Sequence, residues 1–319
     1  MADIAIAQLS EWKGVRGKIA FSEPMSTYTS LKVGGPADLY FAPVDAEDLA
    51  EILTLCQKRG IEWLPFGGGC NLLVTGKGIR GAVIHLKHLI LSGASGGVLD
   101  ALRQWELFPG EEIRLRLSAA LALPRLLNLA LERGWGGVEF LAGIPGTVGG
   151  AVAMNAGTRL GEFGDVVESV EILAVEGRFI HLPAEDLFFS YRHCELPAGS
   201  AVISAEISLY AHPDPREMRA KTAEYMQYRR ESQPLSKPNC GSVFKNPPGY
   251  KAGALIEECG LKGQRIGDAQ ISDLHGNFIV NLGEAKSEDV LALIELAKGV
   301  VCRELKIELE EEVRIVGEK

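Results

Sequence analysis

The chain has 319 residues, of which 46% are hydrophobic and 24% charged, and its formal net charge is −9. A chain of this length exceeds what one hydrophobic core usually serves, so we expect more than one domain. The acidic balance argues against broad binding to nucleic acid or to anionic membranes, because both need a basic field. An anionic ligand would therefore be held by a local group of arginine and lysine side chains.

The N-terminal stretch, residues 1–18, lacks an apolar segment followed by a small-residue cleavage site. No uninterrupted apolar run approaches the ~18 residues that a membrane-spanning helix needs. We therefore expect a cytosolic protein without membrane insertion. The cysteines are scattered, with no CxxC pair and no histidine cluster, which predicts reduced thiols and no metal site; they are Cys56, Cys70, Cys194, Cys240, Cys259 and Cys302.

In the first third of the chain, apolar residues at helical spacing predict a helix over Ala46 to Arg59, which Gly60 ends. Residues 63–74 are typical of a strand, a glycine loop and a second strand. A further strand is predicted over Val83 to Ile90. The pattern of residues 92–112 predicts no definite element.

A second helix is predicted over Leu123 to Arg133, because Pro124 suits a first turn and Gly134 suits the end of a helix. Short alternating runs between Val167 and Leu209 then predict antiparallel strands. Asp214 and Pro215 predict the start of a basic helix that runs to Arg230. Near the C-terminus, Ser287 begins a further helix, and Glu288 and Asp289 suit the positive end of its dipole.

Two glycine-rich segments are candidate ligand loops. In the first, Pro65 to Val74, three consecutive glycines expose backbone N–H groups that suit a pyrophosphate, although a tight hairpin-like turn is the alternative. The segment lacks the G-x-G-x-x-G pattern and no helix follows it directly, which disfavours a Rossmann site. The second segment, Gly136 to Gly157, is typical of a ribbon lying against a flat ring system, or of a twisted sheet corner.

Together these segments resemble those of the UDP-N-acetylenolpyruvoylglucosamine reductases, whose flavin domain belongs to the vanillyl-alcohol-oxidase-like class. The resemblance extends in family order over nearly the whole chain. The further motifs that carry it are Thr29–Ala37 (TSLKVGGPA), the Tyr191-Arg192 pair, Cys240–Pro247 (CGSVFKNP) and Leu309–Arg314 (LEEEVR). The chain lacks the extra tyrosine-bearing loop of one subtype and so resembles the second, shorter subtype.

The resemblance implies an α+β protein with a two-part, PCMH-type FAD-binding domain and a smaller α/β substrate-binding domain. We expect residues 1–18 to be an extension, 19–210 to bind FAD, with a split near residue 90, and 211–319 to bind substrate. The implied activity is reduction of UDP-N-acetylenolpyruvoylglucosamine by NADPH through non-covalent FAD, for peptidoglycan synthesis. A monomer or weak dimer is expected.

For the site, the resemblance implies that Ser242 donates a proton, that Glu312 is the acidic catalytic residue and that Arg192 stabilises the enolate. Tyr191, Lys245, Asn246 and Lys262 would contact the nucleotide sugar. The FAD would be held by Thr29, Gly67, Gly68, Gly69, Cys70, Asn71, Leu72, Gly143, Ile144, Pro145, Gly146, Thr147, Gly149 and Gly150. Two residues depart from the pattern, because Cys70 and Cys194 stand where the family usually has serine.

These residue types suit the reaction. A fixed guanidinium aimed at a developing oxyanion stabilises it strongly, and arginine keeps its charge at neutral pH. Serine is a weak acid, so Ser242 would act through placement in a dry site rather than through acidity. Glu312 would share one face of a strand with Glu308 and Glu310. If that face is solvated, the three acids would be ordinary surface charges without a role in the site.

A group of cations in the C-terminal part could bind the diphosphates of the nucleotide sugar and of NADPH in turn; these are Arg229, Arg230, Lys237, Lys245, Lys262 and Arg265. Two other functions stay open at this point. One is an FAD-linked oxidase of another alcohol or sugar. The other is a catalytically silent protein that binds a UDP-sugar on the same scaffold.

Overall fold

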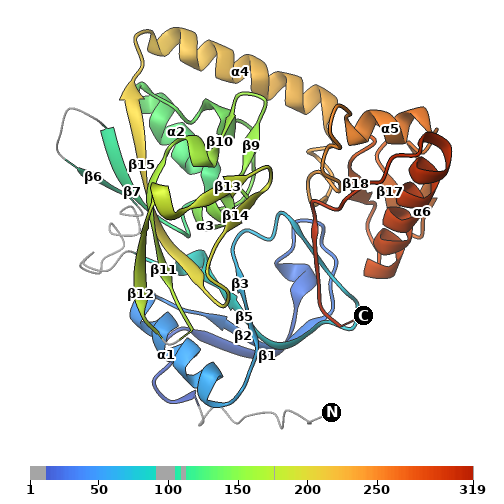
Figure 1. Ribbon diagram of the computed structural model, residues 1–319. Helices are drawn as coiled ribbons and strands as arrows, with labels where there is room; N and C mark the ends of the chain where they lie inside the picture. Colours follow the sequence, from blue (N-terminus) through green and yellow to red (C-terminus); the bar gives the residue numbers. More distant parts are fainter. Residues whose placement is uncertain (1–11, 91–104, 109–112, 176, 319) are drawn as a thin grey trace. The chain divides into compact units, whose positions relative to one another are not determined.

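The computed structural model describes residues 12–90, 105–108, 113–175 and 177–318 (Figure 1). The chain divides into two compact units, each assembled from separate stretches. The first unit contains Met1–Ser22, Leu39–Gly68 and Gly81–Ala223, and the second contains Glu23–Asp38, Gly69–Arg80 and Glu224–Lys319. Two stretches of the N-terminal half thus belong to the same unit as the C-terminal third. Their position in the sequence does not indicate this. Which unit binds which ligand stays a prediction.

The first sheet has four strands in the order β1 (Lys18–Pro24), β2 (Pro36–Ala42), β5 (Ile79–His85) and β3 (Trp63–Phe66). Strands β3 and β5 are parallel, and Phe66 lies opposite His85. Helix α1 (Ala46–Lys58) confirms the first predicted helix. The Asp45 side chain caps its start by accepting a hydrogen bond from the Asp48 N–H. The strand expected over residues 83–90 ends early, at His85, where a 3-10 turn (Leu86–His88) follows.

The second sheet of the first unit is antiparallel and confirms the strands predicted over residues 167–209. Its order is β12 (Phe179–Pro183), β11 (Val167–Leu173), β15 (Ala201–Ala211), β7 (Ile113–Ser118) and β6 (Trp105–Phe108), with β8 (Trp135–Gly136) also paired to β15. Helix α2 (Leu123–Arg133) has the predicted bounds, and Gly134 ends it with a φ of 72°. Of residues 92–112, for which the sequence predicts no definite element, only β6 is among the described residues.

The second glycine-rich segment is not a ribbon. It contains a 3-10 turn (Glu139–Leu141) and a short helix, α3 (Val148–Ala153), so the expectation of an extended segment is wrong. Glycine and valine have weak helix propensity, and the buried side chains of Val148, Ala151 and Val152 stabilise this helix instead. Two small hairpins follow along the chain: β9 (Gly157–Thr158) with β10 (Gly161–Glu162), and β13 (Phe188–Ser190) with β14 (His193–Glu195).

Helix α4 (Pro215–Ser232) confirms the predicted basic helix. The Asp214 carboxylate accepts hydrogen bonds from the N–H groups of Arg216 and Glu217, as an N-cap side chain does. The boundary between the two units falls within this helix, after Ala223. Among the helices of the described residues, α4 included, we find none with the length and apolar character required to cross a bilayer.

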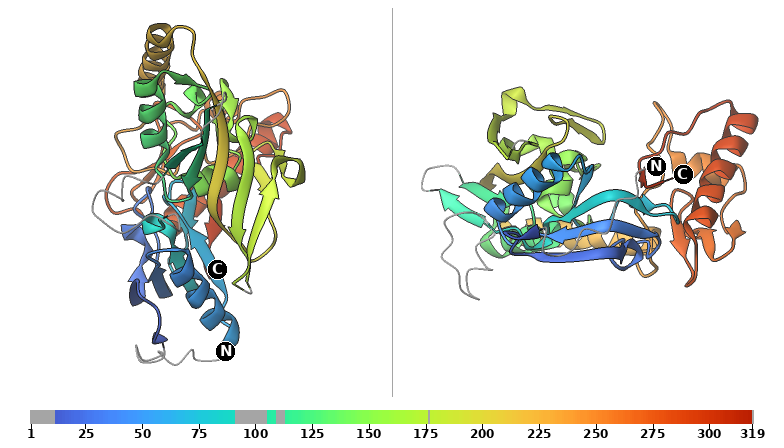
Figure 2. Two further views of the ribbon diagram at one scale, coloured as in Figure 1. Left: turned by 90° about the vertical axis from the view of Figure 1, so that its left-hand side faces the viewer. Right: turned by 90° about the horizontal axis from the view of Figure 1, so that it is seen from below.

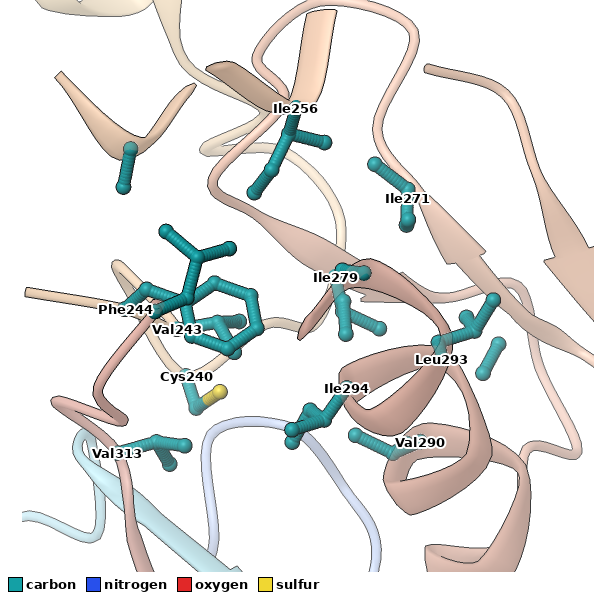
Figure 3. Close-up of a cluster of buried hydrophobic side chains, with 14 of the residues drawn as sticks. Cys240, Val243, Phe244, Ile256, Ile271, Ile279, Val290, Leu293, Ile294 and Val313 are labelled. Carbon is teal, nitrogen blue, oxygen red and sulfur yellow. The ribbon is translucent and has the colours of Figure 1, made fainter. Parts of the chain in front are cut away.

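The second unit packs helix α6 (Ser287–Leu305) against a small antiparallel sheet (Figure 2). The sheet is formed by β16 (Arg265–Ile266), β17 (Ala269–Ile271) and β18 (Ile279–Asn281), and helix α5 (Ala252–Glu258) also contacts α6. Apolar side chains from α6 and the sheet form the core, in which Ile279, Leu293 and Ile294 are almost fully buried (Figure 3). The start of α6 at Ser287 is as predicted.

The C-terminal strand differs from its prediction. The sequence places a strand over Leu309–Arg314, whereas β19 runs over Arg314–Val316 and pairs in parallel with β4 (Leu72–Val74). Residues 306–313 form only one isolated bridge. The alternation of buried and exposed side chains in this stretch therefore does not come from a regular strand.

Candidate active site

The backbone around Ser242 is fixed by the core of the second unit. Cys240, Val243 and Phe244 are buried in the hydrophobic cluster, where Val313 also lies (Figure 3). Gly241 has a φ of 79°, a conformation that a glycine adopts without strain. The serine itself is half-buried. Its position is therefore set by its buried neighbours, while the residue itself keeps part of its surface exposed.

Ser242 and Glu312 lie on neighbouring backbone segments. The Glu312 N–H donates to the carbonyl of Val243 at 2.8 Å, and the Lys245 N–H donates to the carbonyl of Glu310 at 2.9 Å. Between these bonds, Phe244 and Glu311 form an antiparallel bridge. The structure thus brings together two of the three residues that the sequence assigns to catalysis, although 70 positions separate them in the chain.

Asn277 holds the same segment from a different part of the unit. Its carbonyl accepts a hydrogen bond from the Val243 N–H, and its side chain pairs with the backbone of Phe244 in both directions. The Phe244 N–H donates to Oδ1 at 2.9 Å, and Nδ2 donates to the Phe244 carbonyl at 2.8 Å. Because Asn277 is only 4% exposed, these bonds are shielded from water. The sequence analysis did not single out this residue.

Glu312 differs from the two acids that precede it. Glu308 and Glu310 are exposed, whereas Glu312 is half-buried. Burial raises the pKa of the Cys240 thiol to about 12, and the negative charge of Glu312 acts in the same direction. The carboxylate of Glu312 therefore lies close enough to the loop that carries Ser242 to act on it electrostatically.

The second half of the first glycine loop joins this cluster. Nδ2 of Asn71 donates to the Glu312 carbonyl at 3.0 Å, and the Arg314 N–H donates to the Asn71 carbonyl at 3.1 Å. Ser30, next to the expected FAD residue Thr29, donates its hydroxyl to the Asn239 carbonyl, and its N–H donates to Gly69. Residues expected to bind FAD thus pack against the segment that carries Glu312, the expected catalytic acid.

Cys70, which stands where the family usually has serine, forms part of this cluster. Burial raises the pKa of its thiol, although a hydrogen bond with the Ser30 side chain acts in the opposite direction. The thiol is therefore neutral at physiological pH and a poor nucleophile. The substitution keeps a small side chain that can hydrogen-bond to Ser30.

In the first unit, the two glycine-rich segments approach one another. A Cβ atom on Gly67 would lie 2.6 Å from Oγ1 of Thr147, so no larger residue fits without displacement. Gly143 and Gly146 have φ angles of 76° and 113°, in the region that favours glycine. The bare backbone of Gly67 therefore lets the two glycine-rich segments meet, and glycine loops of this kind offer backbone N–H groups to a phosphate. The residues present fit FAD.

His85, the last residue of β5, contacts the first glycine loop. Its Nδ1 is 2.7 Å from the Tyr40 hydroxyl, and its ring meets Phe66 edge-on with 4.8 Å between centroids. Burial lowers the pKa of His85 to about 4, while a hydrogen bond with the backbone of Gly67 acts in the opposite direction. A neutral imidazole therefore links the sheet to the loop. Its isolated position in the sequence gave no signal of this role.

Arg192 lies in the first unit, at the tip of the hairpin that β13 and β14 form. Tyr191 and Arg192 are the two turn residues, since Ser190 pairs with His193. Arg192 has a φ of 59°, which is unusual for a residue other than glycine, and its guanidinium lies 5.1 Å from the centroid of the Tyr191 ring. Because Ser242 and Glu312 belong to the second unit, the role of Arg192 beside them stays a proposal.

The lysines expected to bind the nucleotide sugar have acidic partners. Lys245 Nζ lies 2.6 Å from Glu310 Oε1, and Lys262 Nζ lies 3.2 Å from Glu257 Oε1. Asn246 accepts a hydrogen bond from the Ala252 N–H at the start of α5. A diphosphate at this surface would therefore have to replace carboxylates as partners of these lysines.

Comparison with known proteins defines the class first. One family model, an FAD binding domain, matches residues 37–183, and another, the C-terminal domain of UDP-N-acetylenolpyruvoylglucosamine reductase, matches residues 233–316. With the antiparallel sheet and glycine loops, these matches define an FAD-dependent oxidoreductase of α+β, PCMH-type fold, as the sequence predicts.

Relatives then specify the family. The chain is 43% identical to the UDP-N-acetylenolpyruvoylglucosamine reductase of Heliobacterium modesticaldum, over 95% of this chain and 92% of the relative. It is 40% identical to the enzyme of that name from Moorella thermoacetica, over 96% and 95% of the two chains. The crystal structure of the Thermus caldophilus reductase matches with a TM-score of 0.75 and 37% identity, over 94% and 98% of the chains. The chain belongs to the UDP-N-acetylenolpyruvoylglucosamine reductase family.

Proposed function

We propose that this protein reduces UDP-N-acetylenolpyruvoylglucosamine to UDP-N-acetylmuramate in the cytoplasm, as a step of peptidoglycan precursor synthesis. The observation that supports the proposal is the backbone pairing of the segment that contains Ser242 with the segment that contains Glu312, because one carries a hydroxyl group and the other a half-buried acid. When bound, FAD supplies the hydride relay between NADPH and the substrate, since no side chain can supply a hydride.

In this proposal the chain holds FAD with two sets of residues. One set is Gly67, Gly68 and the segment from Gly143 to Gly150, and the other is Thr29 with residues 69–72. The close approach of Gly67 to Thr147 supports the first set, and the bonds of Ser30 and Asn71 to the active-site cluster support the second.

The remaining residues handle charge and protons on the substrate. Arg192 binds the substrate carboxylate and stabilises the negative charge that develops there, which is where a fixed donor has most effect. Ser242 gives its hydroxyl proton to the carbon next to that carboxylate, and Glu312 orients the substrate or a water that returns the proton to the serine. Buried Cys240 and Val243 hold the segment that carries Ser242, and a bound substrate would cover its hydroxyl and exclude water from this transfer.

The test is an anaerobic two-step titration of the purified protein, saturated with FAD and followed by visible absorption. NADPH should bleach the flavin band, and UDP-N-acetylenolpyruvoylglucosamine should then restore it with formation of UDP-N-acetylmuramate. Failure to bind added FAD would refute the proposal. Reoxidation by dioxygen but not by this substrate would instead favour an oxidase, and nucleotide-sugar binding without any bleaching would favour a silent binding protein.

A further inference from the structure

Asn155 uses both halves of its side-chain amide to join two segments of the first unit. Its Nδ2 donates to the Ser190 carbonyl at 3.0 Å, and its Oδ1 accepts from the Gly164 N–H at 2.9 Å. The residue is 0% exposed, so water does not compete for these bonds. It also has a φ of 40°, a conformation that asparagine tolerates better than most residues.

Each end of this connection leads to a part of the proposed site. On one side, Asn155 lies two residues beyond the end of α3, and both belong to the second glycine-rich segment. The helix and the asparagine are continuous in hydrogen bonding, because the Asn155 N–H donates to Val152 and the Ala156 N–H donates to Ala151. On the other side, Ser190 is the last strand residue before the Tyr191-Arg192 turn.

The hairpin that carries Arg192 needs such an anchor. Within the described residues, β13 and β14 pair only with each other, and a two-stranded hairpin alone is at best marginally stable in water. Phe188 and Tyr191 are exposed, whereas Cys194 is buried and the Phe189 ring lies against Gly164. Contacts between α3 and β14, and the bond from Asn155 to Ser190, also hold the hairpin and lie close to the turn (Figure 1).

We propose that Asn155 is a positioning residue, which fixes the Arg192 turn relative to the glycine segment that holds the flavin. The inference rests on the proposed function, since it acts through the role of Arg192. A displacement of about 1 Å at a reacting group can cost about 10²-fold in rate. Loss of the anchor should therefore impair the step that uses Arg192 and leave the reduction of the flavin by NADPH unchanged.

Asn155→Asp is the most informative variant. A carboxylate still accepts the Gly164 N–H but cannot donate to the Ser190 carbonyl, so the change removes the bond to the hairpin and also places a charge at a buried position. Asn155→Gly is the second variant, because glycine accepts the φ of 40° and removes the amide without adding a buried charge. Thr158→Ala is the matched control, since it removes a hydrogen bond to Phe140 in the same segment but does not touch the hairpin.

The experiment measures both half-reactions of the FAD-loaded protein by rapid mixing, together with flavin content. Both Asn155 variants should slow reoxidation by UDP-N-acetylenolpyruvoylglucosamine by about 10²-fold, with flavin content and reduction by NADPH near normal. The same changes are then made in an Arg192→Lys background. If Asn155 acts through Arg192, the second change should add little there, because the two effects share one interaction.

The two proposals fail in different ways. If Arg192→Lys itself reoxidises normally, the role assigned to Arg192 is wrong. Two results would overturn the inference about Asn155 when Arg192→Lys itself reoxidises slowly. In one, the Asn155 variants reoxidise at the normal rate. In the other, they slow reoxidation in the Arg192→Lys background by the same factor as in the unaltered protein, which would show that Asn155 does not act through Arg192. Loss of flavin from both Asn155 variants, with Thr158→Ala intact, would make Asn155 a residue of the flavin-binding fold and would also overturn it.

Discussion

Asn277→Ala should destabilise the second unit more than a typical asparagine substitution. The change keeps the backbone bonds of residue 277 and removes only the side-chain amide, so the N–H and carbonyl of Phe244 both lose their partners. Phe244 is 2% exposed, and water cannot easily replace them. A buried polar group without a partner costs ~1–3 kcal/mol, so two of them should cost ~2–6 kcal/mol. That is a large part of the ~5–15 kcal/mol that stabilises a typical protein.

Urea unfolding of the flavin-free protein, followed by circular dichroism, measures this loss. Asn246→Ala is the control, because Asn246 is exposed and its side chain accepts a bond from the Ala252 N–H. We expect it to cost less than ~1 kcal/mol, since an exposed amide can be replaced by water. A loss below ~1 kcal/mol for Asn277→Ala as well would refute the reasoning, because the Phe244 backbone would then have to find other partners.

Three further outcomes are expected. Ser242→Ala should leave flavin reduction by NADPH near normal and slow reoxidation by the enolpyruvyl substrate ~10²–10⁴-fold in stopped-flow measurements; the reverse pattern would assign Ser242 to cofactor positioning. Because the pKa of His85 is lowered from 6.5 to about 4 in the folded protein, the unfolded chain takes up the proton first as the pH falls. The contribution of His85 to the free energy of unfolding is therefore fully present above pH 6.5 and falls by ~3 kcal/mol towards pH 4. Urea unfolding across this range should show the fall, and His85→Gln should flatten it. Gly67→Ala should weaken FAD binding roughly tenfold in a fluorescence titration, and adding Thr147→Ala should restore part of the affinity, whereas unchanged binding would exclude a cofactor role for this contact.

Local signals in the sequence predicted the helices well. Asp45 and Asp214 both accept N–H groups at the start of their helices, and Gly60 and Gly134 both have positive φ angles just beyond the end of theirs. These features depend on a few adjacent residues, so no knowledge of the fold is needed to recognise them. The motif that contains Ser242 was likewise recognisable, because its residues are contiguous.

Long-range pairing could not be predicted in the same way. The parallel pairing of Leu72–Val74 with Arg314–Val316 joins segments more than 230 residues apart, and nothing in either short run specifies the other. The same pairing places Asn71 against Glu312 and brings the first glycine loop to the catalytic cluster. Helix α3 was missed for a related reason, since burial of its apolar side chains outweighs the poor helix propensity of its glycines.

The residues that the sequence did not reveal, Asn155 and Asn277, share one physical property. Both are buried, and both use a primary amide as donor and acceptor towards the backbone of an irregular segment. A peptide group also offers one uncharged donor and one uncharged acceptor. Each asparagine side chain therefore makes the hydrogen bonds that a neighbouring strand would make, Asn155 beside the turn of Arg192 and Asn277 beside the segment of Ser242. A carboxylate would have to bury a charge and could not donate, and a hydroxyl could not span both partners. Amide side chains of this kind therefore allow the segments proposed to carry Arg192 and Ser242 to be both irregular and rigid.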